Sequence, residues 1–307
     1  MQVRAAIVAL TALAVAMPPA ASASQFVDLV RGQAPVTLKV DRGNRAMVYY
    51  QKGGAARHVL VTGAVNARQP SRAVRQVRFR IDYSGGWRTT RRALWKSFPN
   101  ACGAYDGPAL PHLVAACKAP NGSYWALQEW MVDQPNFGVL PWTVRQRSYS
   151  LRISHWSMPV AEVELHADWI YAGRFHEVFG RATYLGHPVY GFSSTSRGAP
   201  TDGYGRLLYL DTFGSAYGSG WRRENAFLPH RPNGVFCAGF YRHNGRGPGN
   251  GSRYRVTLIG PGVTPDVAST VSGLHDFSHN SSDVSYEAQQ NRILDRLAAG
   301  GRWCHRH

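Results

Sequence analysis

A six-residue segment occurs twice in this chain, as YSGGWR at residues 83–88 and as YGSGWR at residues 217–222. With each copy come, in the same order, an arginine pair, which in the second copy begins with the last residue of the motif, then a Pro-Asn pair, a cysteine and an Asn-Gly-Ser tripeptide. Chance rarely keeps the order of so many landmarks, and self-similarity at a fixed offset is typical of duplicated structural units. We therefore expect one fold unit duplicated in tandem.

The pattern between these landmarks is that of a β protein. From residue 36 onward, short runs of β-branched and aromatic residues are separated by Gly, Pro and Asn about every ten positions. The predicted fold class is mostly β, with two tandem homologous β-sandwich-like units related by internal duplication. We place the first unit at residues 24–145 and the second at residues 146–268.

Four local elements follow from the same pattern. Residues 36–51 predict a hairpin around a Gly-Asn turn, and residues 77–83 predict a half-buried strand with a basic outer face. The apolar spacing within residues 108–117 predicts a short helix in the first unit. A C-terminal extension, residues 269–307, is expected to contain a helix that is held in place by a disulfide.

The N-terminus has the features of a secretory signal peptide. Arg4 supplies a positive charge, residues 5–17 are apolar, and Ala21-Ser22-Ala23 is a small-x-small cleavage site. The apolar run is shorter than the ~20 residues that a spanning helix needs. We expect residues 1–23 to be removed and the protein to be secreted, extracellular or associated with the cell wall.

Charge and cysteine content are consistent with this location. The formal net charge is +17, and most of the basic residues are arginine. Such a charge favours polyanionic partners, although genome composition and solubility would explain it equally well. In an oxidising compartment the four cysteines are expected to form disulfides. We prefer Cys102 with Cys117 and Cys237 with Cys304 among the three possible pairings.

The repeated motif supplies the candidate ligand-binding residues. A tryptophan offers a flat apolar face to a sugar ring, and an arginine offers a planar fork of donors to an anion. Alternatively, each tryptophan fills the core of its own unit, and exposure of the indoles distinguishes the two. The candidates are Trp87, Arg88, Tyr217, Trp221, Arg222, Arg223 and His230, with Arg78, Arg80, Arg91 and Arg92 as additional charge.

The second unit carries acidic residues that the first lacks near the motif. Asp211 and Glu224, together with Asp202 and His230, would provide paired carboxylates for acid/base hydrolysis of a glycosidic bond if their loops converged. Solvated loop charges are the alternative explanation. On this reasoning the second unit is the one expected to have gained a function.

A stripe of acidic residues and one histidine lies on one face of a predicted strand. Glu162, Glu164, His166 and Asp168 alternate with apolar residues, and oxygen ligands of this kind suit Ca²⁺. One strand cannot surround an ion, so Glu164, His166 and Asp168 remain candidates only and no metal site is predicted.

No motif fixes an activity, because the chain has no nucleophile elbow, zinc-protease helix, phosphate loop or dinucleotide fingerprint. The main hypothesis is a monomeric, secreted protein without a cofactor that binds an anionic polysaccharide or another cell-wall polymer. The alternatives are an extracellular polysaccharide hydrolase and a purely structural protein. Nucleic acid is not the expected partner, since no known nucleic-acid-binding module is present.

Overall fold

The computed structural model is mostly β, with several antiparallel sheets and a C-terminal helix. It describes residues 24–30, 35–65, 77–131, 149–157, 159–171, 175–188, 193–194, 200–201, 207–215, 218–223, 226–227, 233–240, 252–259, 265–272 and 281–299.

Two four-stranded antiparallel sheets make up the first part of the molecule. Their orders are β1-β8-β7-β6, called sheet A, and β2-β3-β4-β5, called sheet B. The strands are β1 (Ser24–Val30), β2 (Thr37–Val40), β3 (Ala46–Lys52), β4 (Ala55–Gly63), β5 (Phe79–Asp82), β6 (Leu113–Lys118), β7 (Tyr124–Met131) and β8 (Tyr149–Trp156). A four-residue helix, α1 (Trp87–Thr90), and a 3₁₀ turn, η1 (Leu94–Lys96), follow β5.

Two further sheets and the long helix make up the second part. Their orders are β11-β10-β17-β16, with β9 beside β10, called sheet C, and β12-β13-β14-β18-β19, with β15 beside β14, called sheet D. The strands are β9 (Glu162–Tyr171), β10 (Phe175–Tyr184), β11 (His187–Pro188), β12 (Ser193–Ser194), β13 (Pro200–Thr201), β14 (Leu207–Ser215), β15 (Gly218–Arg223), β16 (Ala226–Phe227), β17 (Val235–Phe240), β18 (Arg253–Ile259) and β19 (Val267–Ser272). The helix α2 (Ser281–Ala298) follows.

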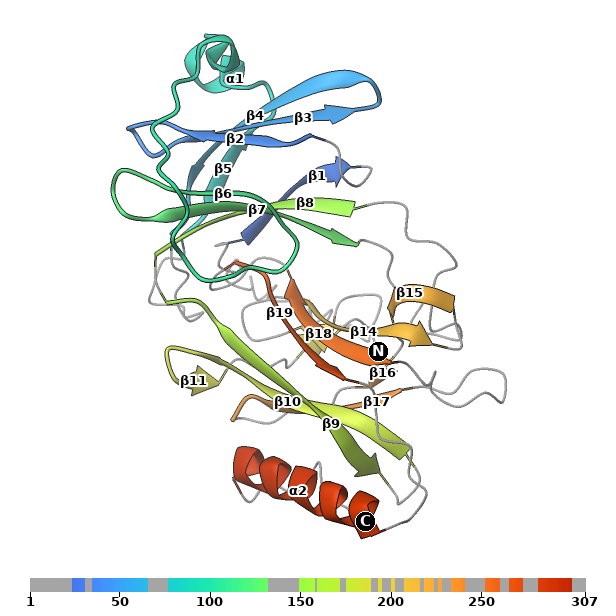
Figure 1. The fold of residues 1–307 in the computed structure, drawn as a ribbon. Helices are drawn as coiled ribbons and strands as arrows, with labels where there is room; N and C mark the ends of the chain where they lie inside the picture. The colour runs from blue at the N-terminus through green and yellow to red at the C-terminus, as the bar shows by residue number, and fades with distance from the viewer. Residues whose placement is uncertain are drawn as a thin grey trace, which may run out of the picture.

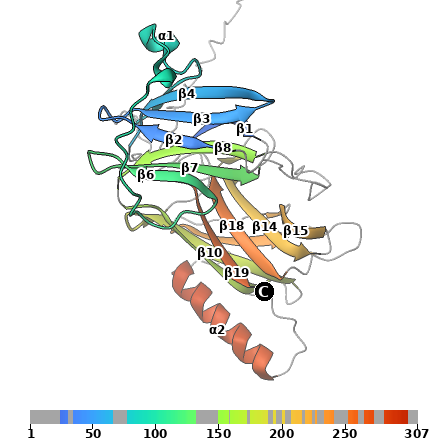
Figure 2. The same ribbon diagram turned by 45° about the horizontal axis from the view of Figure 1, so that its top comes forward.

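These elements lie in layers, with α1 at one end and α2 at the other (Figures 1 and 2). Sheets A and B share one core cluster, in which Val48 and Val61 of sheet B pack with Trp125 and Ile153 of sheet A. Sheets C and D share another, which includes Val178, Leu210 and Val256. Leu294 of α2 packs against Phe179 and Val235 on the outer face of sheet C. The layers follow from strand alternation, which places every second side chain on the same face.

Several sequence-based expectations are confirmed. The predicted hairpin is the β2–β3 pair, and Asn44 in its turn has a φ of 58°. Arg78 and Arg80 are exposed on and before β5, as expected for a basic outer face. The C-terminal helix is α2, and the disulfide between Cys102 and Cys117 is present.

The predicted helix at residues 108–117 is wrong. Residues Leu113–Lys118 form β6, which pairs with β7, and the left-handed backbone of His112 (φ 53°) is incompatible with a continuous helix. The apolar spacing was compatible with a helix, but pairing with β7 decides the conformation. Helical structure in this part of the chain occurs instead at α1 and η1.

The two copies of the repeated motif have different backbones. In the first copy a turn precedes α1, whereas residues 218–222 of the second copy lie in β15 and pair with β14. The structure does not show the internal duplication that the two copies predict. In addition, β8 lies beyond the predicted boundary at residue 145, yet it pairs with β1 and β7 of sheet A.

A buried polar layer joins the two parts. The side-chain amide of Gln128 donates to the Asp266 carbonyl oxygen at 2.8 Å, and its oxygen accepts the Asp266 backbone N–H at 3.2 Å. The Asp266 carboxylate forms an ion pair with Arg152 at 3.0 Å and is fully buried. Nearby, Arg255 bridges His112 and Asp211. The outer faces of sheets A and D therefore meet through buried polar groups.

A buried histidine ties the turn of the β2–β3 hairpin to sheet A. The His155 Nδ1 atom donates to the Gly63 carbonyl oxygen at 2.7 Å, so Nε2 is left to accept from Asn44 at 3.1 Å. Its ring stacks on Trp125 with centroids 3.9 Å apart, and the Trp125 indole N–H donates to Asn44. Burial lowers the pKa of His155 to about 4, against a partial opposing effect of its hydrogen bonds to the backbone.

We expect acid to destabilise the protein through His155. Between the ordinary pKa of 6.5 and the folded-state pKa of about 4, only the unfolded chain binds this proton, so stability falls as pH falls through this range. The contribution is on the order of 3 kcal/mol. Urea denaturation of wild type and His155→Gln at pH 7 and pH 4.5 should show a smaller pH effect in the variant. Equal pH effects would contradict this assignment.

We expect Asp266→Ala to destabilise the protein by about 3–5 kcal/mol, because it leaves the buried Arg152 without its counterion. Denaturant unfolding measures the difference. Asp106→Asn is the matched control, since Asp106 forms an exposed ion pair with Lys118 and should change stability little. A loss at Asp266 no larger than at Asp106 would show that the buried layer does not hold the two parts together.

Candidate functional site

The first copy of the repeated motif forms a loop that is organised by one carboxylate. Asp82 ends β5, and its Oδ1 accepts from the backbone and the hydroxyl of Ser84. Its Oδ2 accepts from the Thr89 backbone at 3.1 Å and from the Thr89 hydroxyl at 2.8 Å. Burial alone would raise the pKa of Asp82, but these hydrogen bonds outweigh it and hold the pKa below its ordinary value.

The two glycines of the motif are required by this turn. Gly85 and Gly86 have φ values of 61° and 104°, in the region that disfavours residues with a side chain. A Cβ on Gly86 would lie 2.8 Å from the Leu94 side chain. A Cβ on Gly85 would lie 3.0 Å from Trp95. The turn is therefore packed closely against the segment that follows it.

That following segment fixes the loop to the outer face of sheet B. Trp95 stacks on His58 of β4 with centroids 5.3 Å apart, and Tyr49 of β3 donates to the Trp95 carbonyl oxygen at 3.0 Å. Leu94 and Trp95 pack with Met47 and Leu60. Burial lowers the pKa of His58, which favours the neutral ring under Trp95. The motif is thus supported by side chains from β3 and β4.

The loop holds Trp87 at the surface. This side chain is 52% exposed, and Arg88, Arg91 and Arg92 beside it are also exposed. None of these three guanidinium groups has a hydrogen bond or an ion pair within the described part of the chain. We call Trp87, Arg88, Arg91 and Arg92 the Trp87 surface.

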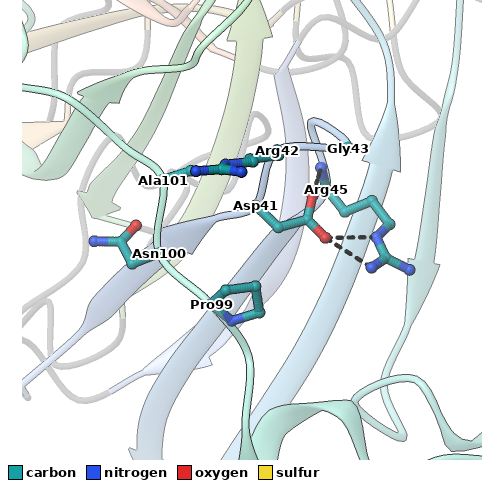
Figure 3. A pocket seen from close by; sticks show the side chains of 7 residues that line it. All are labelled: Asp41, Arg42, Gly43, Arg45, Pro99, Asn100 and Ala101. Atoms are coloured by element: carbon teal, nitrogen blue, oxygen red, sulfur yellow. Dashed lines mark hydrogen bonds and ion pairs between the residues drawn. The ribbon is translucent and has the colours of Figure 1, made fainter.

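Two hollows on this part of the molecule share Arg45. The larger, about 630 Å³, is shown in Figure 3 and is lined by Asp41, Arg42, Gly43, Arg45, Pro99, Asn100 and Ala101. The smaller, about 240 Å³, is lined by Arg45, Leu60, Thr62, Arg80, Ile81, Asp82, Thr89 and Thr90. Since Thr89 and Thr90 belong to α1, the smaller hollow adjoins the element that carries Trp87.

Asp41 fixes the position of Arg45 between the hollows. Its Oδ2 accepts from the Arg45 Nε and Nη2 atoms, each at 2.7 Å (Figure 3). Asp41 is buried, whereas the Arg45 side chain is 41% exposed. The sequence reasoning missed Arg45, Asp82 and Trp95. The adjacency of Asp82 to the motif was visible, but its capping role depends on the folded turn.

The second copy of the motif has a different environment. Trp221 is half-buried and lies between strand neighbours, with its ring edge against Phe213 and the Arg255 guanidinium 4.3 Å from its centroid. Arg222 and Arg223 lie in β15, but their side chains are outside the described part. Tyr217, Glu224 and His230 lie outside the described residues. Of these candidate residues in the second copy, only Trp221 has a side chain whose surroundings the structure describes.

Asp211, a candidate catalytic carboxylate, is 0% exposed. Its Oδ2 accepts from the Arg255 Nε at 3.1 Å and from Nη2 at 2.8 Å, across the register pair that joins β14 and β18. A substrate cannot reach a carboxylate in this position. Asp211 serves as the counterion of Arg255.

The acidic stripe on β9 does not gather into a metal site among the described residues. Glu164 is exposed, and its Oε2 lies 3.3 Å from the Nε2 of His166. The Asp168 side chain lies outside the described part. His166 stacks on Phe179 of the neighbouring strand, with centroids 5.0 Å apart, so its ring packs within sheet C.

Three of the four cysteines are disulfide-bonded in the described part of the chain. Cys102 and Cys117 are bonded to each other, and Cys237 in β17 is also disulfide-bonded. Its expected partner, Cys304, lies outside the described residues.

Comparison of the chain with protein-family models, with curated proteins and with solved structures found no match. Among the described helices, none is long and apolar enough to cross a membrane. The function has to be argued from the geometry above.

We expect Gly86→Ala to loosen the loop, because it places a side chain at a φ of 104° and against Leu94 at a cost of about 1–3 kcal/mol. Limited trypsin digestion should then cleave faster after Arg88, Arg91 and Arg92. Gly53→Ala is the control, since Gly53 also has a positive φ but no atom within 4 Å of the added Cβ. Unchanged cleavage in Gly86→Ala would show that the turn does not depend on this glycine.

Proposed function

We propose that this protein is secreted and that it binds an anionic polysaccharide of the cell envelope through the Trp87 surface. The observation that carries the proposal is the exposed indole of Trp87, held by a closely packed turn and flanked by three exposed arginines without partners in the described part of the chain. An exposed aromatic ring beside guanidinium groups is suited to sugar rings and acidic substituents.

Exposure of Trp87 also supports a binding role over a purely structural one. A tryptophan that only filled the core would be buried, as Trp125, Trp130 and Trp156 are. Trp87 instead lies outside the three core clusters given for the first part. The fixed backbone of α1 supports it without covering it.

The first copy of the motif is better suited to binding than the second. Trp221 is half-buried and stacked with Arg255, and Asp211 is enclosed by the same arginine. The hydrolase alternative depended on Asp211 meeting a substrate with Glu224, so we do not carry it forward. Trp221, Arg222 and Arg223 are not included in the proposed binding surface.

The proposed location rests on the N-terminal sequence and on the disulfides. Residues 1–23 have the pattern of a signal peptide, and bonded cysteines occur at both Cys102–Cys117 and Cys237. Disulfides persist mainly in oxidising compartments. The excess of positive charge, +17 for the whole sequence, attracts the protein to an anionic envelope.

We also retain the β-sandwich interpretation as part of this proposal. Its support is the core cluster that draws side chains from both sheet A and sheet B. This pairing provides a rigid base on which sheet B presents the Trp87 surface outward.

We expect the protein to sediment with purified cell walls at 50 mM salt and to be released at 500 mM salt, because salt screens charge attraction. Trp87→Ala and Arg88→Gln should each weaken binding about tenfold or more, as buried contacts in a binding site do. The controls are Leu185→Ala, an exposed apolar residue, and Arg292→Gln on α2.

Absence of sedimentation at low salt would refute the proposal. Equal losses in the Trp87 and Leu185 variants would place the binding surface elsewhere on the molecule. Thermal unfolding of each variant confirms that the fold is retained.

A further inference from the structure

The smaller hollow beside the Trp87 surface, about 240 Å³, is lined by arginine, threonine and apolar side chains and by one carboxylate. It lies on the outer face of sheet B, where Thr62 is directly opposite Arg80 and Leu60 is directly opposite Asp82 in the β4–β5 register. Arg45 immediately precedes the register pair Ala46–Val61 and lies on the other side of Thr62. A hydroxyl thus lies between two arginines.

We propose that this hollow is a subsite for one acidic sugar unit of the polymer, with its carboxylate held between Arg45 and Arg80. The inference rests on the proposed function, because it treats the hollow as part of the same binding region. It goes further by naming the chemical class of the ligand, a carboxylated sugar such as a uronic acid.

Arg45 and Arg80 differ in the partners that their guanidinium groups have within the described part of the chain. Asp41 holds Arg45 through Nε and Nη2, which leaves about three of its five N–H donors for a ligand. Arg80 is exposed and has no hydrogen bond or ion pair within the described part of the chain. Their Cα atoms are separated by two strand spacings, about 10 Å, which long side chains can span to meet at one carboxylate.

The floor of the hollow favours a ring over a bare anion. Leu60 is buried beneath it, and Ile81 lines it. An apolar floor with a few polar groups at the rim suits the C–H face of a sugar. A phosphate or sulfate group would place polar oxygens against Leu60.

The carboxylate of Asp82 also lines the hollow, and its negative charge offsets part of the attraction from Arg45 and Arg80. All four of its hydrogen bonds come from Ser84 and Thr89, within the loop. Because Thr90 belongs to the same short helix as Trp87, a sugar in the hollow would place the next unit of the chain toward the indole.

The test uses Arg80→Gln, with Arg78→Gln as the matched control. Arg78 is two residues earlier, exposed and also without partners in the described part, but it does not line the hollow. Binding to polygalacturonate, to its carboxyl-reduced form and to dextran sulfate is measured by affinity electrophoresis. A second variant, Thr62→Phe, fills the hollow without changing the charge.

We expect wild type to bind polygalacturonate and not the carboxyl-reduced polymer. Arg80→Gln and Thr62→Phe should each weaken binding to polygalacturonate by about tenfold or more, and Arg78→Gln by less than about threefold. Thr62→Phe should leave binding to dextran sulfate unchanged, because only charge attraction acts there.

Equal losses in Arg80→Gln and Arg78→Gln, or undiminished binding of the carboxyl-reduced polymer, would overturn the inference. Binding to cell walls and dextran sulfate without binding to polygalacturonate would overturn it while leaving the proposed function intact. Failure of wild type to bind cell walls or any of the polymers would refute the proposed function itself.

Discussion

The arrangement of the whole molecule depends on the buried contact between Asp266 and the outer face of sheet A. Gln128 exchanges two hydrogen bonds with the Asp266 backbone, and Arg152 neutralises its carboxylate. These groups are polar and enclosed, so a shift of one sheet against the other would leave charges buried without partners. An apolar contact would tolerate sliding, whereas this one allows a single alignment. The Asp211–Arg255–His112 contact adds a second fixed point along the same junction.

Sheet B lies at the end of the stack away from α2 (Figures 1 and 2), and the loop that carries Trp87 packs on its outer face. On that face, Asp82 organises the turn that precedes Trp87. Asp82 holds both ends of the turn, Gly85 and Gly86 allow the backbone to pass close to Leu94 and Trp95, and Trp87 is left exposed. The same face carries Arg45 and Arg80 around the smaller hollow. The proposed binding region therefore follows from how one loop is anchored on one sheet.

The repeated motif shows where sequence reasoning reached its limit. The two copies have similar amino-acid sequences, but only the first has an aspartate immediately before it. Asp82 caps the turn, whereas Asp211 is several residues away and pairs with Arg255. One copy consequently forms a turn and a short helix, and the other forms a strand. Similar amino-acid sequences did not produce similar backbone conformations, because the neighbouring carboxylate and the available strand-pairing partners differ.

Local sequence patterns were enough to predict the mostly β class, the β2–β3 hairpin, the basic face of β5, the C-terminal helix and the Cys102–Cys117 disulfide. Each depends on alternation, turn residues or spacing within a short stretch of chain. Contacts in the folded protein were needed to establish that Leu113–Lys118 is a strand, that Asp211 is enclosed, and that Trp87 rather than Trp221 is exposed. These outcomes depend on partners far away in the sequence, such as β7, Arg255 and Asp82 with Thr89. A pattern within a short stretch of sequence cannot show which distant side chains will pair with a charged group or bury an aromatic ring.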